Sequence, residues 1–304
     1  MKTVFVGAVE GSHVALSAIC ARGFVPDLVV TLPPDLSHRH SDFADLKPTA
    51  DRYDIPVHYT AKSDSAGTIK TIQAVKPDLI LVIGWSQICG PEFRAQAKIG
   101  CVGFHPSALP RLRGRGVIPW TVILGETDVG ASLFWLGEGA DDGPIAAQAR
   151  YAVDPDTVTA RELYDRALQA LTQLLPQLLT QISEGDIPAA PQPETGISLC
   201  ARRRPEDGLI DWTRPAAEIN RLIRAVGPPY PGAYTYSASG EKLVLLGVQN
   251  TALQGYYIGL PGQIQAIEGN RFTVACGDGK CLDIINWTGA DAPPDLHSKL
   301  RNSE

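Results

Sequence analysis

The stretch GFHPSALPRLRGRGVIPW (residues 103–120) marks the point where a buried strand gives way to an irregular loop. It begins inside the run IGCVGFHP (99–106), whose continuous apolar character is typical of a strand covered on both faces. Pro106 and Pro110 follow, and proline is confined to the edges and ends of strands. The run is therefore predicted to be a central strand that ends at His105, where a loop can carry functional side chains.

A second stretch, EGADDGPIAAQ (138–148), places two acidic residues before another apolar segment. Asp141 and Asp142 stand directly before Gly143. A histidine leaving one buried strand and a carboxylate beside another can form an acid–base pair held by the rigid part of a fold. Each motif alone also has a structural interpretation, with His105 as a hydrogen-bonded core histidine and Asp-Asp-Gly as an ordinary turn.

Apolar and amphipathic segments alternate through the amino-terminal part of the chain. Strands are predicted at 2–9, 24–34, 55–60, 77–85 and 99–106, and helices at 12–23, 40–54 and 65–75. Such alternation is typical of βαβ units, which build a parallel sheet with helices on both faces. The sequence thus predicts an α/β fold with a doubly wound, mainly parallel, Rossmann-like sheet that binds ligands at the carboxyl ends of its strands.

The remaining sequence predicts the end of this domain and a second, β-rich one. Two strands (130–136 and 145–153) and a long helix (159–185), bent at Pro176, complete the first domain. Short strands separated by glycines then follow a proline-rich linker, at 242–249, 262–279 and 281–287. This pattern is typical of a small barrel-like domain. The expected division is a catalytic domain at 1–188, a linker at 189–204 and a C-terminal β-rich domain at 205–304.

Composition limits the classes of function. The 304 residues are 44% hydrophobic and 20% charged, as in ordinary globular proteins. No apolar run approaches the roughly 20 residues that span a bilayer, so no membrane partner is expected. The six cysteines include no C-x-x-C pair. The spacing of Cys276 and Cys281 could serve half of a metal site, but no matching His or Cys cluster follows, which favours free thiols in a cytoplasmic protein and no metal. The net charge of −6 argues against a basic face for nucleic acid.

The first turn of the chain does not support dinucleotide binding. Gly7 and Gly11 are four residues apart and do not complete the pattern G-x-G-x-x-G. Glu10, which stands in the same turn, is a candidate for contact with a substrate.

Together the two stretches resemble the folate-dependent formyltransferase family, which includes methionyl-tRNA formyltransferases and UDP-amino-sugar N-formyltransferases. The family pattern N-x-H-P/G-S-x-L-P-x-x-R-G, followed by D-x-G-x-I, is present here as G-F-H-P-S-A-L-P-R-L-R-G and D-D-G-P-I. Residues 200–236 are similar to the family's joint between domains, and residues 261–279 to its carboxy-terminal β-domain. The resemblance covers nearly the whole chain.

The resemblance implies that the formyl donor is 10-formyltetrahydrofolate and that the acceptor is a primary amine. His105 would stabilise the oxyanion formed by attack of the amine or carry its proton, and Asp141 would orient His105 and accept the proton. Candidates for the folate pocket are Trp85, Gln87, Ile88, Gly139 and Ala140. Candidates for contact with the acceptor are Glu10, Ser107, Arg113 and Arg115. Structural roles are equally open for Trp85, as a cap on the core, and for Arg113, within its loop.

One position departs from the family pattern, because the Asn two residues before the histidine is Gly103. In the family this Asn donates a hydrogen bond to the formyl oxygen, and loss of such a donor typically slows catalysis about a hundred- to thousandfold. The smaller residue is expected to leave space beside His105, faced by Gln87 or Ser107. Phe104 is expected to point to the other side of the strand.

The leading prediction is an N-formyltransferase that acts on a small amine, in particular a nucleotide-linked amino sugar. It depends on the acidic charge balance and on the similarity of residues 200–236 to the amino-sugar enzymes. A methionyl-tRNA formyltransferase is the alternative enzyme, and only this alternative brings in a nucleic-acid partner. A non-catalytic folate- or nucleotide-binding relative is the alternative from a different class, because Gly103 replaces the Asn. A homodimer is left open.

Overall fold

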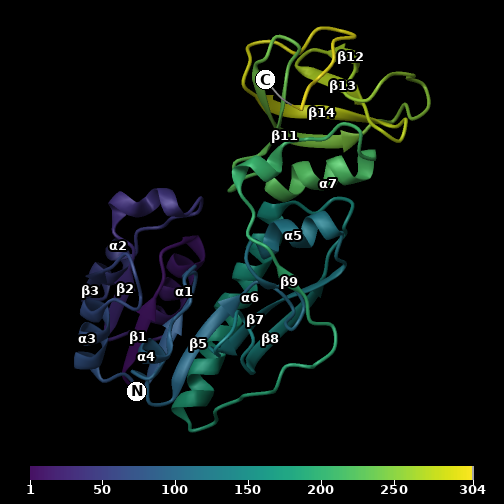
Figure 1. Cartoon of the computed structure of the whole chain (residues 1–304). Coiled ribbons are helices and arrows are strands. Elements are labelled where there is room, and N and C mark those ends of the chain that lie inside the picture. Colours follow the sequence, from purple (N-terminus) through teal and green to yellow (C-terminus); the bar gives the residue numbers. More distant parts are fainter. Residues whose placement is uncertain (303–304) are drawn as a thin grey trace. The chain divides into compact units, whose positions relative to one another are not determined.

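The computed structural model describes residues 1–302 and divides into two compact units. The first unit comprises Met1–Val117, Asp128–Ala152 and Tyr164–Cys200, and the second comprises Ile118–Thr127, Val153–Leu163 and the chain from Ala201 onward. Each unit has its own sheet, which Figure 1 shows with the elements labelled.

The first unit is built on a seven-stranded sheet in the order β3-β2-β1-β4-β5-β7-β8. Neighbouring strands run parallel from β3 to β5, whereas β7 is antiparallel to both β5 and β8. The strands are β1 (Thr3–Val6), β2 (Leu28–Thr31), β3 (Val57–Tyr59), β4 (Leu79–Val82), β5 (Gly100–His105), β7 (Asp128–Trp135) and β8 (Ile145–Ala152). The predicted doubly wound, mainly parallel sheet is confirmed.

Helices cover both faces of this sheet. They are α1 (Glu10–Cys20), α2 (Lys47–Arg52), α3 (Ala66–Val75), α4 (Pro91–Arg94) and most of α6 (Ala160–Ser183), with a 3₁₀ helix, η1 (Pro34–Arg39). On one face Val4 and Val6 belong to the same buried cluster as Ile72 of α3. On the other face Phe104 of β5 packs against a cluster that includes Ala167 of α6. The expectation that Phe104 points away from the side of Gly103 is therefore confirmed, since alternate residues of a strand face opposite sides.

The helix predicted for residues 40–54 is too long, because only Lys47–Arg52 is helical. The preceding residues bind the first turn of the chain instead. Ala44 N donates to Ala8 O at 3.0 Å, and Phe43 forms an isolated bridge with Val9. These contacts between distant segments hold the backbone extended, which local sequence pattern does not reveal.

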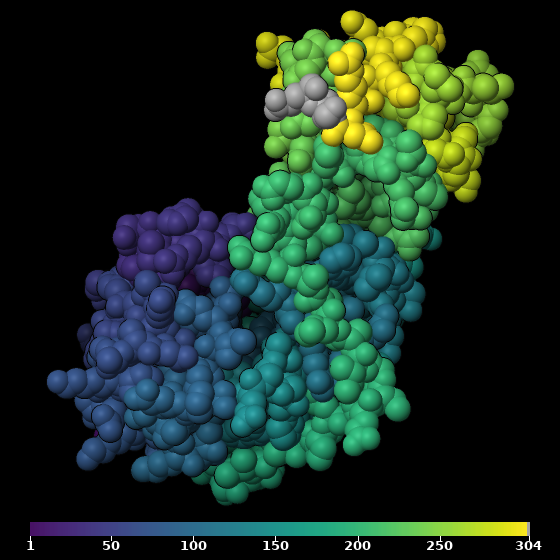
Figure 2. Space-filling model, in the orientation of Figure 1, coloured from purple at the N-terminus to yellow at the C-terminus, as the bar shows by residue number. Residues whose placement is uncertain are grey.

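The segment between α6 and the short strand β9 (Leu199–Cys200) lies on the first unit. Ala190 exchanges two backbone hydrogen bonds with Ile145, at 2.7 and 2.8 Å. β9 then pairs in parallel with β6 (Arg113–Gly114). Figure 1 shows this segment running outside β8, and in Figure 2 the same green stretch is at the surface.

The second unit contains a five-stranded antiparallel sheet in the order β10-β11-β14-β13-β12. Arg301 bridges to Tyr236 of β10, and Lys299 bridges to Gln263 beside β12, so the carboxy-terminal segment closes the order into a barrel-like ring. Trp212 fills the core, and its Nε1 donates to Thr235 Oγ1 at 3.0 Å. The elements are α5 (Val117–Leu124), η2 (Pro205–Gly208), α7 (Ala216–Val226), β10 (Ala233–Tyr236), β11 (Lys242–Asn250), β12 (Ile264–Glu268), β13 (Arg271–Ala275) and β14 (Cys281–Thr288). The predicted β-rich domain is confirmed, whereas α5 and α7 were not predicted. Within residues 1–302, no helix has both the length and the apolar character needed to cross a bilayer.

Candidate active site

His105 is the last residue of β5, and only 6% of its side chain is exposed. Its Nε2 lies 2.7 Å from the carbonyl oxygen of Leu112. Because a carbonyl can only accept a hydrogen bond, Nε2 carries the proton and donates it to Leu112. The other ring nitrogen, Nδ1, lies 3.4 Å from Asp141 Oδ2. The predicted approach of His105 and Asp141 is confirmed.

Asp141 reaches the histidine from the loop that joins β7 to β8. Since β7 is antiparallel to β5, this loop leaves near the start of β5, where Leu136 N donates to Cys101 O at 2.8 Å. It must then fold back along the strand to bring Asp141 to His105. The Asp141 side chain is 21% exposed, so it is the more open member of the pair.

The two residues that approach the nitrogens of the His105 ring, Leu112 and Asp141, have a left-handed backbone. The φ angles are 58° at Leu112 and 52° at Asp141. This conformation costs a non-glycine residue about 1–2 kcal/mol, and such residues concentrate at functional sites. Two hydrogen bonds support it here: Gly114 N donates to Asp141 Oδ2 at 2.7 Å, and Leu112 N donates to Ser198 Oγ at 2.8 Å.

Gln192 links the two loops that meet at His105. Its Nε2 donates to the carbonyl oxygens of Asp141, at 2.8 Å, and Gly143, at 2.7 Å. Its Oε1 accepts from Arg113 Nε at 3.1 Å and from Arg113 Nη2 at 2.7 Å. The Arg113 guanidinium, a candidate for acceptor binding, is thus bound to the protein itself.

Gly103 faces apolar side chains rather than an empty space. A Cβ atom at this position would lie 2.7 Å from Leu136 Cδ2 and 2.9 Å from two ring atoms of Phe134. Phe134 stands directly opposite Gly103 in the β5–β7 pairing. The expectation that Gln87 or Ser107 faces this space is wrong, because the aromatic ring and the leucine occupy it.

Gln87 and Ser107 bind backbone groups near the site. Gln87 Nε2 donates to Ala61 O at 2.9 Å. Ser107 Oγ donates to Arg111 O at 2.8 Å, inside the loop that follows β5. Both side chains brace loops in this structure.

The candidates for the folate pocket differ in exposure. Trp85 is half-buried against the core, and its buried indole Nε1 has no hydrogen-bond partner within residues 1–302. An indole N–H can only donate a hydrogen bond, so this buried nitrogen is a donor without an acceptor. Ile88 is 70% exposed. Gly139 and Ala140 are exposed, and Gly139 N donates to Asp142 Oδ2 at 2.9 Å.

Glu10 begins α1, a helix whose first amides are already bound. Glu10 N donates to Asp42 O at 2.8 Å, and Gly11 N donates to Tyr164 Oη at 3.1 Å. An anion-binding helix N-terminus requires amides that point at the ligand. These two amides therefore do not form the phosphate cradle of a dinucleotide site.

Arg115 is exposed beside a histidine of the loop that follows β2. Burial lowers the pKa of His40, Asp42 acts against this shift, and the charge of Arg115 adds to it. The candidacy of Arg115 as an acceptor ligand stays a prediction.

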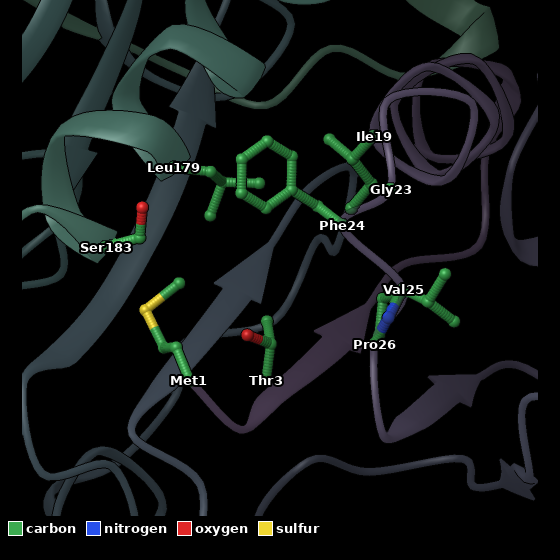
Figure 3. Close-up of a pocket in the computed structure, with 9 residues that line it drawn as sticks. All are labelled: Met1, Thr3, Ile19, Gly23, Phe24, Val25, Pro26, Leu179 and Ser183. Carbon is green, nitrogen blue, oxygen red and sulfur yellow. The ribbon is translucent and has the colours of Figure 1, made fainter.

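A separate cavity of about 210 Å³ lies at the amino end of β1 (Figure 3). Its lining includes Ile19, Phe24 and Leu179, with hydroxyls from Thr3 and Ser183. Since β1 runs parallel to β4 and β5, this cavity and His105 are at opposite ends of the strands. Its lining side chains include no carboxylate, imidazole or amine, so it is not a candidate for acid–base chemistry.

Sequence reasoning missed Gln192 and Phe134. Gln192 lies in the stretch interpreted as a linker, and its one signal is its place between Pro191 and Pro193, which restrict the backbone. Phe134 reads as an ordinary apolar strand residue. Its contact with Gly103 follows from the strand register, which a single sequence does not give.

Two family models match the chain. The model described as "Formyl transferase" matches residues 28–179, and the one described as "Formyl transferase, C-terminal domain" matches residues 203–290. A methionyl-tRNA formyltransferase of Symbiobacterium thermophilum is 32% identical over 286 residues, which are 93% of this chain and 86% of that protein. The resemblance expected from the sequence is confirmed.

Solved structures with low sequence identity share the fold. The N-formyltransferase from Helicobacter canadensis, solved with folinic acid and dTDP-3-aminofucose, has a TM-score of 0.66 and 18% identity, covering 93% of this chain and 98% of that chain. HypX from Aquifex aeolicus, solved with tetrahydrofolic acid, has a TM-score of 0.66 and 17% identity over 96% of this chain. The chain spans 44% of HypX.

Proposed function

Because this chain belongs to the formyl transferase family, we propose that it transfers the formyl group of 10-formyltetrahydrofolate to a primary amine of a small acceptor, a nucleotide-linked amino sugar. The observation that carries the proposal is the pairing of His105 with Asp141, 3.4 Å apart, at the end of a buried strand. Formyl transfer to an amine needs a proton acceptor at this kind of position.

Attack of the amine on the formyl carbon of the donor would form the new C–N bond and put negative charge on the formyl oxygen. As this oxyanion collapses, the bond between the formyl carbon and the donor nitrogen would break. Tetrahydrofolate would leave with a proton on that nitrogen, and the acceptor nitrogen, an ammonium after the attack, would lose one. Asp141 is the more exposed member of the pair, and its carboxylate meets the ammonium. His105 stands behind it with Nε2–H fixed on Leu112 O, so Nδ1 receives or shares the proton that Asp141 accepts. Charge built during the reaction is thereby divided between two groups held in place.

We place the folate ring of the donor beside the loop after β4 and the loop that carries Gly139. The unpartnered Trp85 indole N–H can donate to a carbonyl of such a ring, and the exposed Ile88 can cover its face. Gly139 and Ala140 present a small, exposed backbone surface. A ring placed by these groups would leave the acid–base work to His105 and Asp141.

The acceptor is proposed to be small chiefly because the chain carries an acidic net charge, and two arginines of the second unit are bound within the protein. Arg203 stacks over the Trp120 ring at 5.0 Å, and Arg224 donates to Pro155 O at 2.9 Å. The net charge of −6 disfavours binding of a long, negatively charged acceptor such as tRNA.

A methionyl-tRNA acceptor is the second candidate, favoured by the relative that is 32% identical over 93% of this chain. The test mixes the protein with 10-formyltetrahydrofolate and a panel of acceptors that includes amino-sugar nucleotides and methionyl-tRNA, and follows release of tetrahydrofolate. Turnover with amino-sugar nucleotides supports the proposal. Turnover confined to methionyl-tRNA, with salt-sensitive binding, replaces it by the second candidate.

The same assay tests the roles of the pair. We expect His105→Ala and Asp141→Asn each to lower turnover at least about a hundredfold, the lower range for general acid–base groups. Glu194→Gln, an exposed substitution on the same unit, serves as the matched control. Folate binding without turnover on any amine would identify a non-catalytic relative, consistent with Gly103 in place of the family's Asn.

A further inference from the structure

We infer that Gln192 is a positioning residue that holds Asp141 and the carbonyl of Leu112 on either side of the His105 ring. The inference rests on the proposed function, because it assigns a role in the chemistry of that pair. The side chain itself does not touch the ring. It acts through the two loops to which it is bound.

The carboxamide of Gln192 uses its full hydrogen-bonding capacity. A glutamine amide has two N–H donors and an oxygen with two lone pairs. Both donors bind carbonyls of the Asp141 loop, and both lone pairs accept from Arg113. The nitrogen therefore has to face the Asp141 loop and the oxygen has to face Arg113, so the carboxamide is held in one orientation.

The points of attachment explain why this matters for His105. One side of the carboxamide binds the backbone of Asp141 itself. The other binds the side chain of Arg113, the residue next to Leu112 along the chain. Asp141 and Leu112 are the strained, left-handed residues that contact the two ring nitrogens. Because the Gln192 carboxamide binds both loops, it opposes their relaxation. It thereby keeps Leu112 O and Asp141 Oδ2 at a fixed separation on either side of the His105 ring.

The segment between α6 and β9, which contains Gln192, is held to the first unit by other contacts as well. Ala190 binds Ile145 through two backbone hydrogen bonds, and Trp135 Nε1 donates to Pro188 O at 2.8 Å. Strand β9 binds β6 further along. Figure 2 shows the segment at the surface of the first unit. Loss of Gln192 contacts should therefore leave the segment in place while releasing the Asp141 loop.

Two substitutions of Gln192 distinguish its hydrogen bonds to the Asp141 loop from its hydrogen bonds to Arg113. Gln192→Leu keeps much of the volume and removes every hydrogen bond. Gln192→Glu keeps a partner for Arg113 but turns an oxygen toward the carbonyls of Asp141 and Gly143, where repulsion replaces two hydrogen bonds. We expect both variants to lower kcat about ten- to a hundredfold, as misplacement of a reacting group by about 1 Å can do.

A double substitution distinguishes positioning from general destabilisation. If Gln192 acts through Asp141, adding Gln192→Leu to Asp141→Asn should lower kcat little further, since residues that act as a unit are not additive. Glu194→Gln is the control on the same segment and should leave kcat unchanged. Full additivity, or a Gln192→Glu enzyme as active as wild type, would overturn the inference.

A second readout does not need turnover. In protein labelled with ¹⁵N-histidine, the Nε2–H form of His105 should dominate in the wild type and in Glu194→Gln, and should lose its dominance in Gln192→Leu. If the wild type transfers no formyl group but this change is seen, the proposed reaction fails while the positioning role stands. If the His105 signals are the same in all three folded proteins, the positioning role fails whatever the reaction is.

Discussion

Replacement of Gly103 by Asn would restore the family's residue, yet the structure predicts that it harms the protein. From the sequence alone, Gly103→Asn should preserve or raise turnover if formyl transfer is the native reaction and Gly103 is only a missing donor, whereas a clear loss would mean that the glycine makes room for a different acceptor or mechanism. In the structure the Cβ direction of Gly103 points at Leu136 and Phe134, at 2.7 and 2.9 Å. The new side chain would therefore enter occupied space.

The cost has two parts. Contacts below 3.0 Å must be relieved by moving neighbours, and Phe134 is only 3% exposed, so it cannot turn to solvent. Overpacking of this kind costs about 1–3 kcal/mol. An amide buried against apolar side chains without partners costs about 1–3 kcal/mol more. A central sum of about 4 kcal/mol corresponds to a fall in Tm of about 8–16 °C at about 2–4 °C per kcal/mol.

Thermal melts of four variants test this reasoning. Gly103→Ala adds only the Cβ atom and should lose less stability than Gly103→Asn. Phe134→Leu removes the ring that opposes Gly103 and has a cost of its own from the cavity. In the double variant Gly103→Asn, Phe134→Leu, the asparagine gains room, so the two effects should be less than additive, with a coupling of about 0.5–3 kcal/mol. Release of tetrahydrofolate is measured on the same samples.

One outcome would refute the argument. If Gly103→Asn melts at the wild-type temperature and turns over faster, then Phe134 and Leu136 give way without cost and the glycine is only a handicap. Strict additivity in the double variant would show that Phe134 does not occupy the asparagine's space.

Two further predictions concern other parts of the first unit. Tyr164→Phe removes the hydroxyl that accepts from Gly11 N at 3.1 Å and leaves this buried amide unpaired. The free energy of unfolding, measured in urea, should fall by about 1–3 kcal/mol. An unchanged urea midpoint would contradict this prediction. Burial raises the pKa of Cys89 and of Cys101 to about 12, so at pH 8 both remain thiols and iodoacetamide should spare them in the folded protein; mass spectrometry of the alkylated protein before and after denaturation checks this.

The sheet could be predicted from sequence because its strands are buried on both faces. TVFV in β1 and LILV in β4 are buried along their whole length, so each reads as an uninterrupted apolar run. The segment at 40–46 could not be predicted, because its conformation depends on hydrogen bonds to the distant first turn. Local pattern carries no record of such partners.

The candidate site also contains residues that the sequence predicted and residues that it could not predict. His105 and Asp141 were found because proline, glycine and acidic residues mark the ends of two apolar runs. Gln192 was not found, because it acts through backbone carbonyls, which any sequence provides. Phe134 was not found because its neighbour across the sheet is fixed by the register of β5 and β7.

Phe134 and Leu136 also change the electrostatics that His105 and Asp141 work in. The family's Asn would offer a donor to the developing oxyanion, and here that side of the strand is apolar. An apolar wall lowers the local dielectric, which strengthens every charge interaction that remains between fixed groups. The loss of one donor and the strengthening of the pair of His105 and Asp141 therefore act in opposite directions. Adding the donor back without removing the apolar wall disturbs the packing beside the pair, so Gly103, Phe134 and Leu136 are best understood as one packed unit.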